Sequence, residues 1–345
     1  MKRKILFLFL FTLLLFSGCA AIENTPERTS SEFNGTTSLE PIKLRIGIFP
    51  FSSYLPLYMA QVEGYFAEQG LDVELVDFTR QADIIPALIT KQIDVVGLAI
   101  DAATLSAINQ EPGLKIVADK GVINANAKCS YGGFLANMAL INSGDLNNPE
   151  SLTEKTFIFP PASQFEYMLD QALLPFNLNT SEVTTAYMPI PTIFEAFQTG
   201  ELDVAHMSEP WLSRVAETGK AGIWHSYEDL NPGGQLSVII FGSSVTQENL
   251  EAGNRFMAAY LQAVQQYNQG KTDRNIELMA EFTNSDLASA ASSCWLSFAP
   301  DGSVNLQSIL DFQEWAIARG YVDNMLTIDQ FWDGSYLDHY YQNNR

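Results

Sequence analysis

Apolar and polar residues along the chain alternate in segments that are typical of strands, and segments with helical spacing separate them. The first such strand is predicted over Lys43–Phe49, where polar and apolar residues alternate. The other predicted strands are Leu71–Phe78, Ile93–Ile100, Leu114–Ala118, Thr156–Phe159, Val183–Met188 and Leu202–Met207. The helices predicted between them are Leu57–Gln69, Asp83–Gln92, Ala102–Asn109, Phe165–Leu174 and Pro191–Thr199. Strands separated by helices indicate βαβ units and an α/β fold with mainly parallel sheets.

The C-terminal third of the chain has a different pattern, which is mostly helical from about Val245. Residues 248–269 carry apolar side chains three or four positions apart, as on one face of an amphipathic helix. Further helices are predicted over 274–283, 286–294, 305–319 and 327–342.

One short segment occurs twice. Ala87–Val95 aligns with Ala196–Val204 at an offset of 109 residues, and four of the nine aligned positions are identical. Each copy reads as the end of a helix, a tight turn and a buried strand. The repeated segment therefore favours two similar α/β lobes. It does not indicate a solenoid, because it occurs only twice.

The N-terminus is organised differently from the rest. A basic cluster at Met1–Lys4 precedes an apolar run at Ile5–Phe16, and Ser17, Gly18 and Cys19 follow. This order is typical of a secretory signal, and the run is shorter than the roughly 20 residues that span a bilayer. A Cys after Ser-Gly resembles a bacterial lipobox. We expect residues 1–18 to be a lipoprotein signal peptide and 19–40 to be the lipidated Cys19 with a flexible polar tether.

Charge narrows the range of partners. The 345 residues include 19 Lys and Arg against 40 Asp and Glu, a net charge of −21. Removing residues 1–18 takes away three basic and no acidic residues, which leaves −24. Phosphate binding needs concentrated basic side chains, so the charge argues against a nucleic-acid partner and against docking on an anionic membrane through the folded surface.

Cysteine and histidine offer little for metal chemistry. The three histidines are scattered and no Cys-x-x-Cys spacing occurs, so no metal site is expected. Cys129 and Cys294 form an even pair in a chain that we expect to be exported. They are either a disulfide or two buried free thiols.

Residues 44–119 and a later segment, 196–211, resemble a known family. The runs LRIGIFPFSSYLPLYMAQVEGYFAEQGLDVELVDF, ALITKQIDVVGLAIDAATL and AFQTGELDVAHMSEPW resemble the substrate-binding proteins of ABC importers, in the group that binds alkanesulfonates and taurine, thiamine pyrimidines or riboflavin. The resemblance covers about residues 41–270. It implies a two-lobe periplasmic-binding-protein fold of type II, in which each lobe is a mainly parallel sheet flanked by helices and the ligand cleft lies between the lobes.

Carried onto this chain, the resemblance gives a discontinuous division. Lobe one would be 41–140 plus 235–345, lobe two would be 141–234, and the chain would cross near 133–141 and 236–242. The function implied is that of a monomeric, cofactor-free binder, not an enzyme. It would be exported and anchored to the cell membrane through Cys19, with its folded domain outside the cytoplasm, and would deliver a small organic nutrient to an ABC permease.

Candidate ligand-binding residues follow from the strand ends, because open α/β sheets bind ligands beyond the carboxyl ends of their strands. The loops selected supply Ser52, Tyr54, Tyr58, Arg80, Asp101, Ser163, Gln164, Glu209 and Trp211. Structural roles compete at each of them: a hydrophobic plug for the tyrosines, a helix cap for Asp101 and Ser163, and a solvated surface cation for Arg80. Glu209 beside Trp211 suits a flat ring that carries N–H groups. The carboxylate would accept hydrogen bonds from these N–H groups, and the indole would stack on the ring.

The nature of the ligand is inferred from the same loops. Arg80 is their one obvious cation, and aromatic and carboxylate side chains are frequent. We therefore expect a flat heteroaromatic vitamin, riboflavin first, with a thiamine-precursor pyrimidine or a sulfonate such as taurine as alternatives. A different class is an enzyme similar to those that build the thiamine pyrimidine. Those enzymes carry a cysteine-rich, histidine-bearing iron motif, whereas the nearest stretch here has Cys129 alone and no neighbouring His.

Overall fold

The computed structural model describes residues 40–344. The predicted signal peptide, Cys19 and nearly all of the predicted tether lie outside the described residues. Within residues 40–344, no helix is both long enough and apolar enough to cross a membrane.

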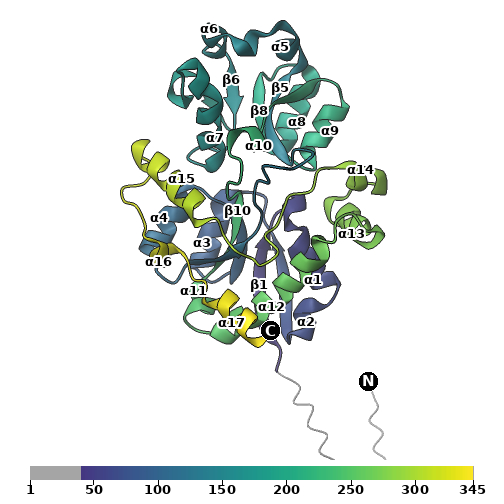
Figure 1. Cartoon of the computed structure of the whole chain (residues 1–345), viewed down its shortest axis with the longest axis vertical. Coiled ribbons are helices and arrows are strands. Elements are labelled where there is room, and N and C mark those ends of the chain that lie inside the picture. The colour runs from purple at the N-terminus through teal and green to yellow at the C-terminus, as the bar shows by residue number, and fades with distance from the viewer. Residues whose placement is uncertain (1–39, 345) are drawn as a thin grey trace, which may run out of the picture. The chain divides into compact units, whose positions relative to one another are not determined.

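Two five-stranded sheets organise the described residues (Figure 1). The first has the order β2-β1-β3-β10-β4, with β1 (Ile42–Ile48), β2 (Leu71–Asp77), β3 (Val95–Ala99), β4 (Lys115–Asp119) and β10 (Ser237–Phe241). The second has the order β7-β6-β8-β5-β9, with β5 (Gly132–Asn137), β6 (Thr156–Ile158), β7 (Thr184–Ala186), β8 (Val204–Ser208) and β9 (Ala221–Ser226). In each sheet one strand, β10 or β5, runs against its neighbours. The mainly parallel α/β prediction is therefore confirmed.

Helices flank both sheets. Those that follow the strands of the first half are α1 (Leu55–Val62), α2 (Tyr65–Glu68), α3 (Ile84–Ile89) and α4 (Ala102–Gln110). Those around the second sheet are α5 (Met138–Ser143), α6 (Pro149–Leu152), α7 (Gln164–Leu173), α8 (Ile190–Thr199), α9 (Trp211–Glu217) and α10 (Tyr227–Leu230). The C-terminal part supplies α11 (Ser243–Thr246), α12 (Leu250–Tyr267), α13 (Asp273–Thr283), α14 (Leu287–Ser292), α15 (Leu306–Ala318), α16 (Ile328–Phe331) and α17 (Ser335–Asn343).

Two predicted helices are wrong in extent. The helix expected over 57–69 is divided into α1 and α2, because Gly64 between them has a φ of +85°, a left-handed conformation that ends a helix. The helix expected over 327–342 is likewise divided into α16 and α17, with Trp332 between them in an extended conformation.

The amphipathic helix α12 supplies much of the core beside the first sheet. It lies against α1, α2 and α17 in the lower half of Figure 1. Phe256 and Tyr260 of this helix are fully buried, and Phe256 stacks on Phe66 of α2 with ring centroids 5.7 Å apart. The apolar face that the sequence pattern predicted is therefore the face that covers the sheet.

The repeated segment occupies equivalent places in the two sheets. One copy runs from the end of α3 to Val95, the first residue of β3, and the other from the end of α8 to Val204, the first residue of β8. Both strands lie at the centre of their sheets. Asp94 accepts a hydrogen bond from the backbone N–H of Arg45 at 2.9 Å, on the neighbouring strand β1. Asp203 accepts one from the backbone N–H of Thr156 at 2.9 Å, at the start of the neighbouring strand β6. The same aspartate thus aligns a central strand with its neighbour in both sheets.

Residues 120–131 and 231–236 connect the two sheets. They are hydrogen-bonded to each other, since the Ile123 N–H donates to the Gly234 carbonyl at 2.9 Å and the Gly233 N–H donates to the Ile123 carbonyl at 2.8 Å. The segments expected to cross, 133–141 and 236–242, overlap the antiparallel strands β5 and β10 instead. The lobe boundaries at 140/141 and 234/235 remain a prediction, and β5 belongs to the second sheet.

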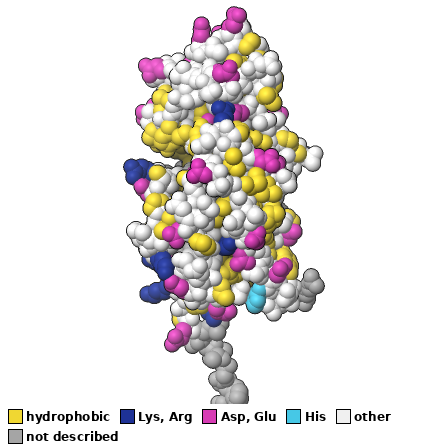
Figure 2. Space-filling view, turned by 90° about the vertical axis from the view of Figure 1, so that its left-hand side faces the viewer, with side chains coloured by type: hydrophobic (Ala, Val, Ile, Leu, Met, Phe, Trp, Pro, Cys, Tyr) yellow, Lys and Arg dark blue, Asp and Glu magenta, His cyan; other side chains and the backbone are white. Residues whose placement is uncertain are grey.

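Acidic side chains are spread over the face shown in Figure 2, and basic ones are few there. This distribution agrees with the excess of Asp and Glu in the sequence. Several of the basic side chains are also paired on the surface, as Arg274 is with Glu63 at 2.6 Å.

The two equivalent aspartates differ in how many groups they hold, which gives a first test. Asp94 also accepts from the Arg45 guanidinium at 3.1 and 3.0 Å and from Ser244 at 2.8 Å. Because charge-assisted hydrogen bonds are the stronger ones, Asp94→Ala should lower the free energy of unfolding by about 2–3 kcal/mol and Asp203→Ala by about 1 kcal/mol. Urea unfolding measures both, and an equal or larger loss for Asp203→Ala would contradict the assignment.

Candidate ligand-binding site

The loops at the carboxyl ends of strands from both sheets meet one another. The Ser52 hydroxyl, after β1, donates to the Glu209 carbonyl, after β8, at 3.1 Å. After β3 and β6, the Ala102 N–H donates to the Ala162 carbonyl at 2.9 Å, and the Gln164 N–H donates to the Ile100 carbonyl at 3.2 Å. Loops whose bonded residues are at least 60 positions apart in the sequence thus form one junction.

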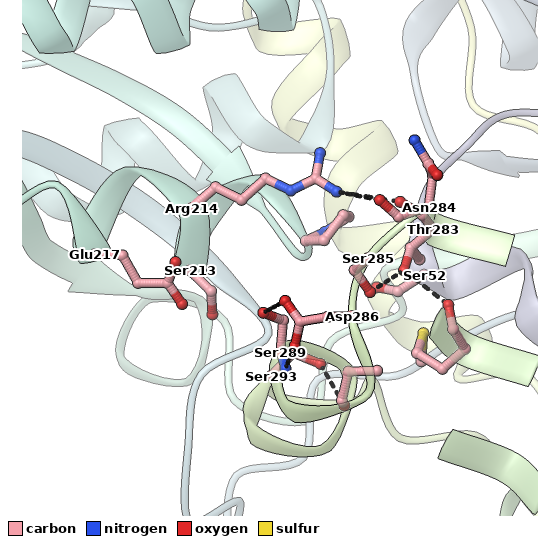
Figure 3. Close-up of a pocket in the computed structure, with 13 residues that line it drawn as sticks. Ser52, Ser213, Arg214, Glu217, Thr283, Asn284, Ser285, Asp286, Ser289 and Ser293 are labelled. Carbon is pink, nitrogen blue, oxygen red and sulfur yellow. Dashed lines mark hydrogen bonds between the residues drawn. The ribbon is translucent and has the colours of Figure 1, made fainter. Parts of the chain in front are cut away.

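A cavity of about 310 Å³ opens beside this junction (Figure 3). Three segments form its wall: the loop with Ser52, the helix α9 with Pro210 before it, and the stretch from α13 to just beyond α14. Hydroxyl and amide groups dominate the lining, which comprises Ser52, Pro210, Ser213, Arg214, Glu217, Met279, Thr283, Asn284, Ser285, Asp286, Ser289, Ala290 and Ser293. All six lining hydroxyls already make a hydrogen bond within the protein, so they offer a small polar ligand mainly acceptor oxygens, whereas the Arg214 guanidinium and the Asn284 amide carry donors.

Arg214 is the one cation among these lining residues. Its guanidinium reaches from α9 to the carbonyls of Thr283 and Asn284, at 3.1 and 3.4 Å, where α13 ends (Figure 3). A cation at a helix C-terminus is favoured by the helix dipole. The guanidinium also lies 4.9 Å from the ring of Trp211, one turn earlier on α9. Arg214 therefore joins the second sheet's side of the cavity to the α13 side.

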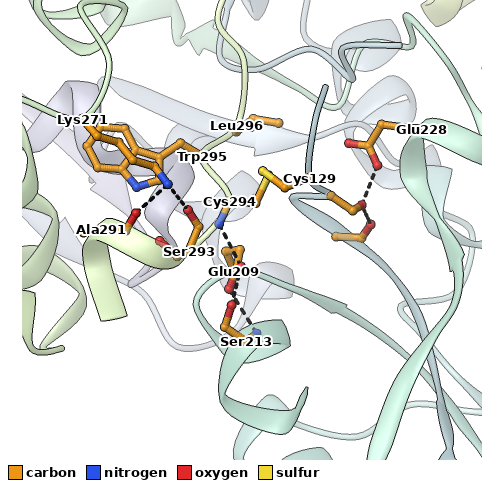
Figure 4. The surroundings of a disulfide bond; sticks show 12 residues. Cys129, Glu209, Ser213, Glu228, Lys271, Ala291, Ser293, Cys294, Trp295 and Leu296 are labelled. Atoms are coloured by element: carbon orange, nitrogen blue, oxygen red, sulfur yellow. Dashed lines mark hydrogen bonds between the residues drawn. A yellow bond between two sulfur atoms is a disulfide. The ribbon is translucent and has the colours of Figure 1, made fainter. Parts of the chain in front are cut away.

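Glu209 is placed at the centre of the junction, where it is only 1 % exposed. Its carboxylate accepts from the Ser213 hydroxyl at 2.6 Å, the Ser213 N–H at 3.2 Å and the Cys294 N–H at 3.1 Å (Figure 4). Burial raises the pKa of Glu209, and these hydrogen bonds partly offset the rise. The carboxylate thus holds the start of α9 against the segment that follows α14.

Cys129 and Cys294 are joined by a disulfide, with their Cα atoms 5.7 Å apart (Figure 4). Cys129 belongs to the connector 120–131, and Cys294 follows the cavity-lining segment 283–293. The bond ties one connector between the sheets to one wall of the cavity.

The predicted aromatic residues lie around the junction but do not line the cavity. Tyr54 is buried, and its hydroxyl donates to the Gly97 carbonyl. Tyr58 is half-buried against Phe282, with ring centroids 5.0 Å apart, and burial together with a hydrogen bond to Glu281 raises the pKa of Tyr58 to about 12. Trp211 packs edge-on against Phe194 at 5.9 Å.

The remaining predicted residues divide into two groups. Asp101 and Ser163 cap α4 and α7, and Gln164 is buried and donates to the Leu236 carbonyl, so these three lie in the contact between the sheets. Burial raises the pKa of Asp101. Arg80 lies apart, because its side chain is 73 % exposed and pairs with Asp83 at 2.6 Å.

Sequence reasoning missed two parts of this region. The cavity wall at 279–293 follows no predicted strand, and its row of serines carries no signal that it faces Ser52. Lys120 lies two residues after the predicted strand Leu114–Ala118 and directly after β4, which ends at Asp119. The search for ligand-binding residues beyond the carboxyl ends of strands could therefore have selected it. Lys120 is 2 % exposed in the structure, with its ammonium 3.5 Å from the centroid of the Tyr54 ring.

Comparison with known proteins decides the family. The model of the family described as "NMT1/THI5 like" matches residues 52–269, well over half of the chain. The chain belongs to the NMT1/THI5-like family. Among curated proteins, the riboflavin-binding protein RibY of Chloroflexus aurantiacus is 25% identical over 120 residues, which is 34% of this chain and 34% of RibY. This chain thus spans only about a third of that relative's length in the match.

Solved structures agree on the fold of this NMT1/THI5-like chain. The ligand-binding component of an ABC-type import system from Staphylococcus aureus, solved with zinc bound, superposes with a TM-score of 0.72 at 15% identity, over 86% of this chain and 98% of that chain. The alkanesulfonate-binding protein SsuA from Xanthomonas axonopodis pv. citri, bound to MOPS, gives 0.66 at 19%, over 85% and 99%. The desulfurization enzyme DszB gives 0.62 at 12%, over 88% and 100%. The predicted type II periplasmic-binding-protein fold is confirmed, and the fold is shared by binders and an enzyme.

Removal of the disulfide should destabilise this family member strongly. Cys129 and Cys294 are 165 residues apart in sequence, so the bond restricts a very long loop of the unfolded chain. We expect Cys294→Ser to lower the free energy of unfolding by about 2–5 kcal/mol, and Cys129→Ser to do the same as the matched variant. Thermal unfolding with and without a reductant measures this. A wild-type melting temperature that a reductant leaves unchanged would refute it.

His206 predicts a pH dependence of stability. It is buried on β8, bonded through Nε2 to the Tyr227 hydroxyl, and burial lowers the pKa of His206 to about 3. The unfolded chain, with a histidine pKa of about 6.5, binds more protons than the folded one between these values. Stability should therefore fall as pH drops below about 6.5, by up to about 1.4 kcal/mol per pH unit from this group.

The variant His206→Gln isolates this contribution, because it keeps a polar partner for Tyr227 without the titration. Other shifted groups, such as Asp119 and His225, are common to both proteins and cancel in the difference. Urea unfolding across this pH range should show a shallower loss for His206→Gln. Parallel curves would contradict the buried neutral histidine.

Proposed function

We propose that this protein is the solute-binding component of an ABC import system, which captures a small organic nutrient and delivers it to a membrane permease. The observation that carries the proposal is the polar cavity beside the junction of strand-end loops from two sheets. Ligand pockets of proteins commonly measure about 300–1,000 Å³ and lie between domains or beyond strand ends, so the size and place of this cavity fit a small ligand. Family membership and the fold add support.

For the ligand we propose a flat heteroaromatic vitamin, with riboflavin first. The partial match to RibY supports this choice. The cavity lining supports it too, because serine hydroxyls and the Asn284 amide suit a ligand that combines ring carbonyls with a polyol chain. Trp211, at the start of α9, remains our candidate for stacking, and Glu209 our candidate acceptor, although its two oxygens already accept from protein groups.

A sulfonate is the alternative that a specific observation favours. Arg214 lies in the cavity wall together with several hydroxyls, and SsuA shares the fold. A thiamine-precursor pyrimidine stays open within the family.

An enzyme of the pyrimidine-synthase kind is the alternative from another class. The disulfide argues against this alternative. Cys129 is the nearest counterpart of the cysteine motif in those enzymes, and the sulfur of Cys129 is bonded to Cys294. A thiol in a disulfide is not available to bind iron. DszB shows that the fold itself does not decide between the classes.

The proposed cellular place follows from the N-terminal residues. We propose an exported protein that a lipid on Cys19 anchors to the cell membrane, with its folded domain outside the cytoplasm. The short apolar run and the Ser-Gly-Cys sequence support this.

Titration of the purified protein tests the ligand. Binding of riboflavin, a thiamine-precursor pyrimidine or MOPS can be followed by tryptophan fluorescence. For the ligand that binds, Arg214→Ala should weaken the affinity about tenfold or more, since it removes the cation and opens the wall between α9 and α13. Arg274→Ala is the control, because Arg274 is a surface arginine paired with Glu63. Equal affinities of Arg214→Ala and the control would exclude this cavity, and turnover of any probe would favour the enzyme.

A further inference from the structure

Lys120 is a buried lysine that the proposed site does not yet use. It directly follows β4, at the strand end where α/β folds bind ligands. Its stem passes over Gly97 of β3, where a Cβ atom would come within 2.2 Å of the lysine Cδ. The missing side chain of Gly97 therefore makes the space that the lysine stem occupies.

The ammonium of Lys120 has few partners in that space. Nζ donates to the Ser53 hydroxyl at 3.1 Å and lies over the Tyr54 ring, 3.5 Å from its centroid. Among residues 40–344, no carboxylate oxygen lies within 4.0 Å of it. An ammonium has three N–H donors, and burying its charge without a counter-charge costs free energy. Within residues 40–344, Ser53 is the one hydrogen-bond acceptor of this ammonium, so its other N–H donors meet no acceptor there.

The nearby carboxylates are committed to other groups. Asp119 accepts from the Gly121 N–H at 2.8 Å, the Gln235 amide at 2.6 Å and the Ala299 N–H at 2.8 Å. Glu209 is held by Ser213 and Cys294. Burial lowers the pKa of Lys120 to about 7, and the neighbouring charge of Asp119 only partly counteracts this.

The lysine lies directly behind the junction of the two sheets. Its partner Ser53 adjoins Ser52, which lines the cavity and donates to the Glu209 carbonyl on the opposite side. A separation of the loops that carry Ser52 and Glu209 would therefore leave the ammonium facing the space between the sheets.

We propose that Lys120 is a specificity-determining residue whose ammonium donates to an acceptor oxygen of the solute, a ring carbonyl or an acid group, once these loops separate. The inference rests on the proposed solute-binding function and deepens it. The proposal also replaces Arg80 as the expected cation of the site. Arg80 lies outside the junction, whereas Arg214 lines the cavity and Lys120 is buried behind the junction.

The test compares wild type with Lys120→Met, which keeps the length of the side chain and removes its charge. The probes are riboflavin, which offers ring carbonyls, and MOPS, which offers a sulfonate. Lys115→Met is the control, since Lys115 lies at the other end of β4 and its ammonium donates to the Asp329 and Gln330 carbonyls. Lys120→Met should weaken binding of the bound probe about tenfold or more, and Lys115→Met should not.

Two further readouts separate a ligand contact from a structural role. The melting temperature of Lys120→Met should be unchanged or higher, because a buried charge without a counter-charge is removed. Calorimetry at about pH 7 in buffers of different ionisation enthalpy should show proton uptake when wild type binds MOPS, and less with Lys120→Met. The wild type and Lys120→Met share the other titratable groups of this region, so the contributions of those groups to proton uptake cancel in the comparison. These groups are Asp119, Tyr54, Tyr131, Tyr260 and Glu209.

The outcomes are distinguishable. Binding by wild type with equal affinity and equal proton uptake by Lys120→Met would overturn the role of Lys120 and leave the proposed function intact. A large loss of melting temperature in Lys120→Met would make Lys120 a structural residue and would overturn it as well. If wild type binds neither probe, the proposed ligand class fails and this inference fails with it.

Discussion

Each sheet is completed by an antiparallel strand, and the rest of the structure depends on that arrangement. β10 follows the strands of the second sheet in sequence but lies in the first sheet, between β3 and β4. β5 is the first strand of the second sheet in sequence and lies between β8 and β9. Backbone hydrogen bonds along both sides of β10 and β5 fix where the two connectors begin and end. The connectors then bond to each other through Ile123 and residues 233–234, so the sheets are joined by a paired ribbon instead of a single flexible link.

This arrangement explains why the buried polar groups gather where they do. The strand ends of both sheets meet beside the connectors, and backbone and side-chain groups there must find partners away from water. The carboxylates of Asp119 and Glu209 do so with backbone N–H groups, an amide and a hydroxyl. Lys120 differs, because in the described part of the chain its ammonium has one hydroxyl as hydrogen-bond acceptor and lies over one aromatic ring. The contrast between satisfied carboxylates and an incompletely satisfied cation is what singles out this lysine among the buried groups.

The fold was more predictable than the site, and particular residues show why. Alternation located β1 and β2, and helical spacing located α12, because their buried faces follow the periods of 2 and 3.6 residues. The same reasoning missed β9 at Ala221–Ser226, an edge strand that is buried at one residue only and so lacks the alternation. It located Ser52 and Glu209 through the strand-end rule. It could not place residues 283–293 in the cavity wall, since that contact depends on how α13 and α14 pack beside α9, and no local pattern records it.

The net charge of the sequence likewise does not predict the charge of the ligand. A net charge of −21 argues against docking of the folded surface on nucleic acid or on an anionic membrane. Yet surface carboxylates interact through water, where ions screen them within about 8–10 Å, while a buried ammonium acts at a lower effective dielectric constant. Arg80 and Lys120 carry the same formal charge, but Arg80 is 73 % exposed beside Asp83 and Lys120 is 2 % exposed with no carboxylate partner within 4.0 Å among the described residues. The charge that a bound solute would meet is therefore set by which cations the fold buries at the strand ends, and the sum over the sequence does not contain that information.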